Sequence, residues 1–233
     1  MSVTSTATTR RTIQLAIDDG VVALRGLSPQ RSRFELEYAL ERGSTANSVL
    51  FAAGDGEPSV LVHPPGAAYS SMFLPVLAEQ LADRDQQLLV VVGHVNPNRV
   101  ALLRDLADNY SKLELITSNA GAKVLAELWT QRKPAPPGQE VEQPPLPDLP
   151  PLRVIRHEQT LAMAHGRCLQ LLATPTPRWP GGLLAFEQSL GLLMSDKFFS
   201  AHLCTEEWAE TNRTSTEEER RHFYDCLMAP MAR

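Results

Sequence analysis

An unbroken apolar stretch at residues 88–92, Leu-Leu-Val-Val-Val, runs into a glycine and then into a polar turn. A run this short, with no polar residue at alternate positions, is typical of a strand that is buried on both faces. Such strands belong to sheets that other elements cover on either side. The stretch therefore predicts a layered protein in which the polar turn after residue 92 opens onto a site.

Strand and helix patterns alternate on either side of this stretch, which indicates an α/β fold. Strands are expected before it at residues 12–17, 21–24, 48–52 and 60–63, and a helix at 70–83. After it we expect a helix at 100–109, a strand at 113–117, a helix at 120–128, short strands at 153–157, 160–164 and 168–173, and a helix at 216–228.

Two segments lack these patterns. Residues 1–12 are expected to be a disordered lead before a single domain at 13–233. Eight prolines lie between residues 133 and 152, and because proline removes backbone donors and favours extended chain, this segment is expected to be a surface excursion or hinge. A ligand for a proline-binding domain is the alternative.

Composition excludes several classes of protein. The formal net charge is −5, and no basic cluster is present, which argues against a nucleic-acid partner. No apolar stretch approaches the roughly 20 residues of a membrane span, and the start has no signal-peptide pattern. The three cysteines are widely spaced, which favours free thiols. We therefore expect a cytoplasmic protein without a membrane partner.

The turn after residue 92 has the layout of a metal loop without its ligands. His94, Asn96, Asn98 and Arg99 would converge from one short turn that Pro97 makes rigid. Asparagine offers only a neutral amide oxygen, and arginine stays protonated and has no lone pair to donate. His94 alone at the end of a strand is more often a hydrogen-bonded structural residue than a ligand.

This turn resembles the His-Thr-Glu-Pro-Asp-His sequence of flavodiiron proteins, position for position and including the proline. A second stretch, residues 174–180, is similar to the family segment that ends in His-Trp-Pro-Asp, with Arg178 in the place of the histidine. A third, residues 193–199, resembles the segment whose aspartate bridges two irons, and Asp196 keeps that carboxylate. Residues 27–31 and 43–48 resemble the opening hairpin of family members from oxygenic phototrophs, so the resemblance covers roughly residues 14–233.

The resemblance implies a metallo-β-lactamase-like αββα sandwich that is incomplete at its C-terminal end. Family members reduce dioxygen to water at a diiron centre, with electrons from NAD(P)H that reach it through FMN. The flavodoxin-like and flavin reductase domains that would follow in the family are not expected in this chain, and neither is FMN.

Of the six ligand positions that the resemblance assigns, His94 and Asp196 are retained, whereas Asn96, Asn98, Arg99 and Arg178 are substitutions. Losing two carboxylates and gaining two guanidiniums reverses the charge of the site, so we expect no metal there. A buried Asp196 then needs a cationic partner, for which Arg99 and Arg178 are the candidates. We expect these two arginines to form a pocket that attracts small anions.

For several other residues the sequence predicts burial, exposure or hydrogen bonding, but no function. Trp179, Phe198 and Phe199 are expected in the core, and Lys197 is expected to face solvent. The remaining histidines have no ligand-like spacing and are expected to be surface or hydrogen-bonded residues: His63, His157, His165, His202 and His222.

Three functions remain to be distinguished. The first is the lactamase-like domain of an oxygen reductase with a degenerate metal site, acting as a homo- or hetero-oligomer with an intact flavodiiron paralogue. The second is a non-catalytic truncated remnant, or an anion-binding structural or interaction domain. The third, a zinc hydrolase, is disfavoured because the turn lacks the ligands for a metal ion that must activate water. On its own, the chain is expected to be inactive.

Overall fold

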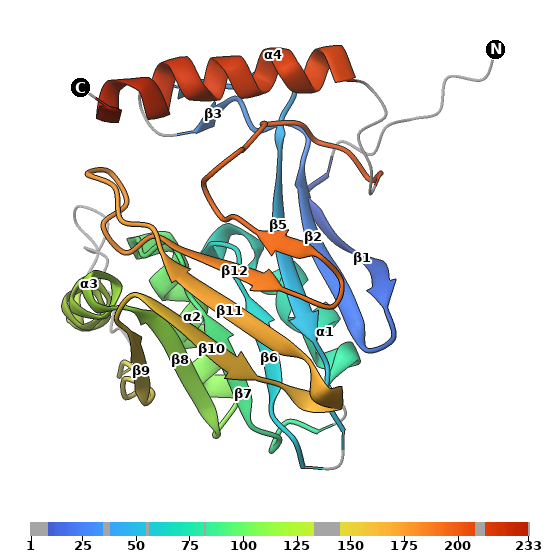
Figure 1. Ribbon diagram of the computed structural model, residues 1–233, viewed down its shortest axis with the longest axis vertical. Helices are drawn as coiled ribbons and strands as arrows, with labels where there is room; N and C mark the ends of the chain where they lie inside the picture. The colour runs from blue at the N-terminus through green and yellow to red at the C-terminus, as the bar shows by residue number, and fades with distance from the viewer. Residues whose placement is uncertain are drawn as a thin grey trace, which may run out of the picture.

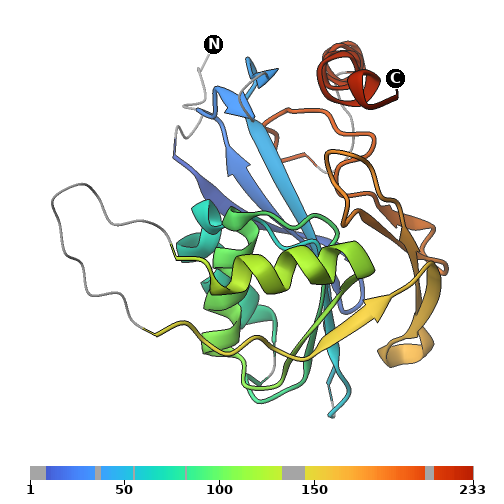
Figure 2. The same ribbon diagram turned by 90° about the vertical axis from the view of Figure 1, so that its left-hand side faces the viewer.

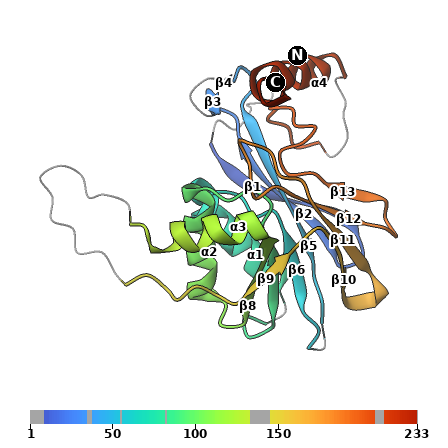
Figure 3. The same ribbon diagram turned by 60° about the vertical axis from the view of Figure 1, so that its left-hand side comes forward.

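A helical layer and two β-sheets are stacked on one another, as Figure 3 shows edge-on. The computed structural model describes residues 9–34, 38–54, 56–81, 83–132, 145–207 and 213–232. Helices α1, α2 and α3 lie on one face of a seven-stranded sheet, and a four-stranded sheet lies on its other face. This arrangement confirms the predicted α/β class.

The larger sheet has the strand order β1-β2-β5-β6-β7-β8-β9. The pairs from β1 to β6 are antiparallel, and those from β6 to β9 are parallel, with helices crossing between the parallel strands. Its strands are β1 (Arg11–Asp18), β2 (Val21–Ser28), β5 (Ser44–Phe51), β6 (Ser59–Val62), β7 (Leu88–Val91), β8 (Leu113–Ser118) and β9 (Leu152–Ile155). The register Ser28↔Ser44 joins the two segments that were expected to form the opening hairpin.

The smaller sheet is antiparallel throughout, in the order β10-β11-β12-β13. Its strands are β10 (Glu158–Ala162), β11 (Cys168–Ala173), β12 (Leu183–Glu187) and β13 (Leu192–Met194). A two-residue pair, β3 (Arg33–Phe34) and β4 (Tyr38–Ala39), stands apart from both sheets.

The helices are α1 (Ser70–Gln80), α2 (Pro97–Asn109), α3 (Asn119–Thr130) and α4 (Arg213–Phe223). A π-helical turn at Tyr224–Met228 and a 3-10 turn at Ala229–Ala232 continue α4. Figure 1 shows α4 across one end of the molecule, beyond the ends of β2 and β5, and among the described residues no helix covers the outer face of the four-stranded sheet. Nor is any helix of this described part long and apolar enough to cross a bilayer.

Strand β7 explains why the sequence lacks alternation at residues 88–92. Leu88, Val90 and Val92 pack into the core between the sheet and the helices. Leu89 and Val91 pack into a second core, between the two sheets. Because both faces are covered, an apolar residue is required at every position.

The predicted N-terminal lead and Pro-rich segment lie only partly within the described residues. Residues 1–8 of the expected lead and residues 133–144 of the Pro-rich segment lie outside the described residues. Arg11 and Thr12 belong to β1, and Leu152 begins β9, so the predicted boundaries at residues 12 and 152 overlap strands. Figure 2 shows the approach to β9 passing below the helices.

Candidate functional site

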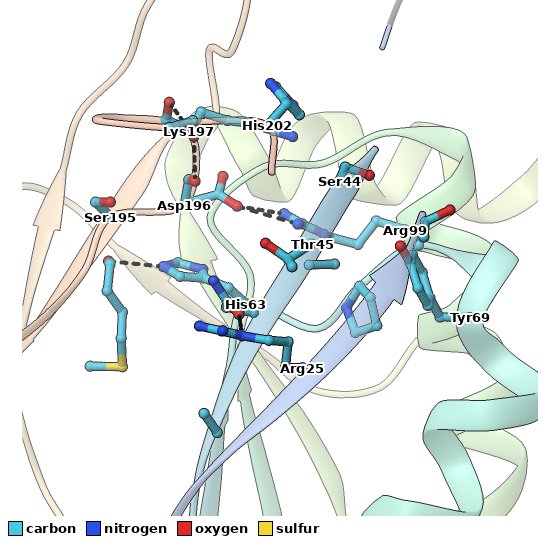
Figure 4. A pocket seen from close by; sticks show the side chains of 18 of the residues that line it. Arg25, Ser44, Thr45, His63, Tyr69, Arg99, Ser195, Asp196, Lys197 and His202 are labelled. Atoms are coloured by element: carbon cyan, nitrogen blue, oxygen red, sulfur yellow. Dashed lines mark hydrogen bonds and ion pairs between the residues drawn. The ribbon is translucent and has the colours of Figure 1, made fainter. Parts of the chain in front are cut away.

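Three strand ends and one helix start meet around a cavity of about 620 Å³. His63 follows β6, the turn at residues 94–99 follows β7, and Asp196 follows β13. The carboxyl ends of parallel strands β6 and β7 lie at the same edge of the sheet, so their following residues converge there. Figure 4 shows His63, Arg99 and Asp196 pointing into the cavity.

The turn after β7 is organised as the start of α2. Asn96 is the N-cap residue, and its Oδ1 accepts a hydrogen bond of 2.8 Å from the Arg99 backbone N–H. Pro97 occupies the first turn, where its missing N–H costs nothing. The amide nitrogen of Asn96 donates to Nε2 of His94 at 3.1 Å. The asparagine therefore serves helix capping and orients His94.

Arg99 and Asp196 form an ion pair at the centre of the cavity wall. Nη1 and Nη2 of Arg99 donate to Oδ1 of Asp196 at 3.2 and 3.3 Å, and Nη1 also donates to the His94 carbonyl at 2.8 Å. The side chains are 11% and 8% exposed, respectively, so the pair is largely removed from water. Burial acts to raise the pKa of Asp196, but the Arg99 guanidinium lowers it well below its usual value. The carboxylate is therefore ionised and neutralised by arginine.

The histidines beside this pair are neutral. Burial, with Lys197 and Arg99 nearby, lowers the pKa of His94 to about 3. Burial also lowers the pKa of His63, whose Nε2 donates to the Met194 carbonyl at 3.2 Å. Nδ1 of His63 has no hydrogen-bond partner among the described residues. His63 has a positive φ of 55°, and its ring lies where only a glycine at position 93 leaves room, since a Cβ there would be 2.7 Å from the ring.

The cavity lining is strongly cationic. Five permanent cations contribute to it, and Asp196 is the one carboxylate among the described lining residues. The cations are Arg10, Arg25, Arg31, Arg99 and Lys197. His202 also lines the cavity, and burial, with Lys197 and Arg31 nearby, lowers its pKa to about 3.

The loop at residues 201–207 is held against the sheet by Arg25. This side chain, 7% exposed, donates to Oδ1 of Asn47 at 2.9 Å and to the Thr205 carbonyl at 3.3 Å. It also donates to the Glu207 carbonyl. Arg25 therefore fixes one wall of the cavity.

The structure brings together five of the six predicted site residues. His94, Asn96, Arg99 and Asp196 are linked by hydrogen bonds, and Asn98 lines the same cavity. Arg178 is not among the described residues that line it. It lies in the connection between β11 and β12, so the partner of Asp196 is Arg99.

Several structural expectations can be compared with the outcome. Trp179 is 2% exposed, stacks on Phe223 with ring centroids 6.2 Å apart, and confirms the core prediction. Phe199 is 72% exposed, so the prediction for that residue is wrong. Lys197 is half-buried in the cavity lining and does not simply face solvent. The three cysteines are free thiols, as expected.

Sequence reasoning did not select His63, Arg25 or His202 as site residues. His63 could have been found from its place directly after a strand that pairs in parallel with β7. Arg25 and His202 have no comparable signal, because a strand interior and a long loop contribute them.

Known proteins resemble this chain in both sequence and structure. No protein-family model matches it. The crystal structure of a fragment, residues 1–254, of diflavin flavoprotein A 5 from Nostoc sp. strain PCC 7120 is 30% identical, with a TM-score of 0.79, and this chain covers 80% of it. The chain belongs to the flavodiiron family. The flavodiiron core of Flv1 from Synechocystis sp. strain PCC 6803, a metal-soaked structure, is 31% identical with a TM-score of 0.81, over 96% of this chain and 51% of that one.

Longer flavodiiron relatives extend well beyond the region matched here. Diflavin flavoprotein A 6 from Nostoc sp. strain PCC 7120 is 36% identical over 94% of this chain, which covers 35% of that protein. The chain thus spans about a third of the length of the curated relatives it matches. Its fold is the metallo-β-lactamase-like core of the family.

Proposed function

We propose that this chain is the lactamase-like core of a flavodiiron-type oxygen reductase, with a degenerate metal site and an intact paralogue as its partner. The reaction of the assembly is the NAD(P)H-dependent, flavin-mediated reduction of dioxygen to water. The observation that supports a degenerate site is the Arg99–Asp196 pair, which places a guanidinium against the retained carboxylate.

The residues around the cavity do not fit a diiron centre. Among the described residues, no three side chains of His, Cys, Asp or Glu are grouped so that they could hold a metal. Asn96 Oδ1 accepts from the Arg99 backbone N–H as the cap of α2, and Asp196 Oδ1 accepts from the Arg99 guanidinium. Because arginine stays protonated, the Arg99 guanidinium keeps its positive charge and repels a metal cation at the same place. No step of oxygen reduction is assigned to these residues.

The function of Arg99 is then structural. Ionised Asp196 in a largely dry wall would cost several kcal/mol without a partner, and the guanidinium offsets much of this cost. The pair joins β13 to the start of α2, so the two sheets keep their relative position without metal. This core would contribute contact surface and not redox chemistry, and FMN would bind elsewhere in the assembly.

The free thiols of Cys168, Cys204 and Cys226 support a cytoplasmic location, since reducing compartments keep thiols in this state.

A non-catalytic anion-binding domain is the second candidate. It is supported by the five permanent cations that line one cavity in a chain whose net charge is −5. In this case Arg99 would serve anion binding as well as Asp196, whereas the position of Arg178 outside the lining leaves no geometric basis for the predicted role of that residue.

Co-expression with a flavodiiron paralogue that has all its metal ligands tests the main proposal. We expect the two chains to co-purify as one species by light scattering, and we expect oxygen uptake by the paralogue to change when this chain is included. The paralogue alone and this chain alone are the controls. Oxygen reduction by this chain alone, or failure of the two chains to associate, would contradict the proposal.

A further inference from the structure

A second group of polar side chains lines the same cavity away from Asp196. It consists of Arg10, Ser28, Arg31, Ser44 and Tyr69, which we call the Tyr69 cluster, and all five line the cavity. Ser28 and Ser44 face each other across the β2–β5 pair. Tyr69 ends a short 3-10 helix before α1, and Figure 4 shows it with Ser44 in the pocket. The cluster uses none of the predicted metal-ligand positions.

Arg10 connects the members of this cluster. Its Nε donates to Ser28 Oγ at 3.3 Å and its Nη1 to the Ala68 carbonyl at 3.0 Å. The guanidinium carbon lies 5.4 Å from the centroid of the Tyr69 ring. These acceptors are neutral, so the bonds orient the guanidinium and leave its charge unbalanced.

Two buried hydroxyls in the cluster have unused hydrogen-bonding capacity. Tyr69 is 4% exposed and Ser44 is 1% exposed. Tyr69 Oη and Ser44 Oγ make no well-formed hydrogen bond among the described residues, although Ser28 and Ser44 lie near enough to the Tyr69 hydroxyl to lower its pKa against the raising effect of burial. Buried polar atoms without a partner are rare and costly, and a bound water or ion is one of the explanations for them. The ring of Tyr69 is set in place by Gly26, where a Cβ would come within 2.7 Å of it.

Arg31 adds a second positive charge. Burial lowers the pKa of the Arg31 guanidinium, and the Arg10 cation nearby also lowers it, whereas Tyr69 acts in the opposite direction. Two guanidiniums that repel each other at a partly enclosed wall create a positive potential that favours an anion. In a chain of net charge −5 this concentration of positive charge is not a property of the whole surface.

We propose that the Tyr69 cluster binds the phosphate group of a small molecule, with Arg10, Arg31, Tyr69 and Ser44 as its donors. Guanidiniums and hydroxyls approach from different elements, which suits a tetrahedral group whose oxygens point in several directions better than a planar carboxylate. The cavity, about 620 Å³, is in the range of small-molecule sites, so the phosphate can be part of a larger molecule. This inference does not depend on the proposed oxygen-reductase role.

Isothermal titration calorimetry of the chain at fixed ionic strength tests the proposal. The probes are inorganic phosphate, pyrophosphate, ATP and citrate. We expect the phosphate compounds to bind and citrate to bind at least about tenfold more weakly, because its planar carboxylates satisfy fewer of the charge-assisted donors. Equal affinity for inorganic phosphate and ATP identifies a free phosphate site, and tighter binding of ATP identifies a phosphorylated molecule.

Four variants locate the site. Arg10→Ala and Arg31→Ala should each weaken phosphate binding about tenfold or more, and Tyr69→Phe should weaken it by a smaller factor while keeping the ring. Arg153→Ala removes the same charge from an exposed pair with Glu114, outside the cavity, and should leave binding unchanged. Thermal melting without ligand confirms that each variant folds.

The result that overturns the proposal is binding that survives Arg10→Ala and Arg31→Ala, or that falls equally in Arg153→Ala. Absence of binding of every phosphate compound to the folded chain, or citrate binding as tightly as phosphate, also overturns it. Loss of binding in Arg99→Ala, with Arg10→Ala unaffected, would place the anion at Arg99 and support the second candidate function instead.

Discussion

Arg99 occupies a position where the family resemblance implies a histidine ligand, and its side chain reaches across the cavity to the one carboxylate retained. Both η nitrogens contact Oδ1 of Asp196, at 3.2 and 3.3 Å, in a site about nine-tenths buried. Removing one partner of a buried pair leaves a charge without compensation, which costs more than the pair itself contributes. The stability of the core is therefore sensitive to either residue.

Arg99→Ala should destabilise the chain by about 3–5 kcal/mol, because it leaves Asp196 ionised and buried. The double substitution Arg99→Met with Asp196→Leu should cost less than either single change, since it removes both charges. Urea unfolding monitored by circular dichroism measures these differences. Arg153→Ala, which breaks an exposed ion pair, is the matched control and should cost at most about 1 kcal/mol. A loss below that value in Arg99→Ala would contradict the account.

His94 should make the fold sensitive to mild acid. Its folded pKa of about 3 lies below the value of 6.5 in the unfolded chain, so the unfolded state binds more protons between these values and stability falls as pH falls. At pH 5 the loss from His94 amounts to about 2 kcal/mol relative to pH 7. His94→Asn should reduce the slope of unfolding free energy against pH, measured in urea at pH 5–7, whereas His157→Asn at an exposed position should not. An unchanged slope in His94→Asn would show that other groups dominate.

The pairing of an arginine with Asp196 could be predicted from the substituted ligand positions, because a retained carboxylate needs a cation once the metal ligands are gone. Which arginine does so could not be predicted, since Arg99 and Arg178 come from different connections whose approach depends on how the two sheets pack. The contributions of Arg25 and His202 to the cavity also depend on that packing.

At the scale of elements, the turn after β7 is organised by the cap of α2. Asn96 caps α2 and Pro97 begins it, so the turn is held by the Asn96 side chain together with the first backbone hydrogen bond of the helix, from the Val100 N–H to the Asn96 carbonyl. Asparagine is among the best N-cap residues because its side chain satisfies an amide that the helix leaves free. The substitution of a ligand position by asparagine is thus consistent with a stable turn that holds no metal.

Asn96→Ala should lower the free energy of unfolding by about 1 kcal/mol through loss of the cap. Asn98→Ala, two residues later at an exposed position, provides the matched control and should have an effect below about 0.5 kcal/mol. Chemical unfolding of the two variants beside the unsubstituted chain gives the comparison. Equal effects would mean that the cap does not stabilise α2.

The positions of the helices and strands could largely be predicted from the sequence. Which of their residues face the core was harder to predict. The apolar run at residues 88–92 correctly indicated a strand covered on both faces, because a strand with one face in water would carry polar residues at alternate positions. In α1 the helical spacing of the apolar residues favoured Met72, Leu74, Leu77 and Leu81, and of these the structure buries Leu77, together with Phe73. Apolar residues are consecutive there, and the position of the helix over β1 and β2 decides which of them face the core.

For the whole molecule, two cores flank one sheet, and the cavity lies at the edge where strand ends from both sheets meet. The layered arrangement followed from the alternation of strands and helices, and its metallo-β-lactamase-like form from the family resemblance. A cationic pocket was expected from Arg99 and Arg178, but the contributions of Arg10, Arg25 and Arg31 were not, because the β1–β2–β5 pairing is what brings these residues to the cavity.

We propose that a guanidinium takes the place of metal beside Asp196. Elemental analysis of the chain after anaerobic incubation with Fe(II) and desalting tests it most directly, with Asp196→Ala as the reference for adventitious iron. The account predicts that the unsubstituted chain retains no more iron than this variant. Two irons per chain, lost in Asp196→Ala, would contradict it.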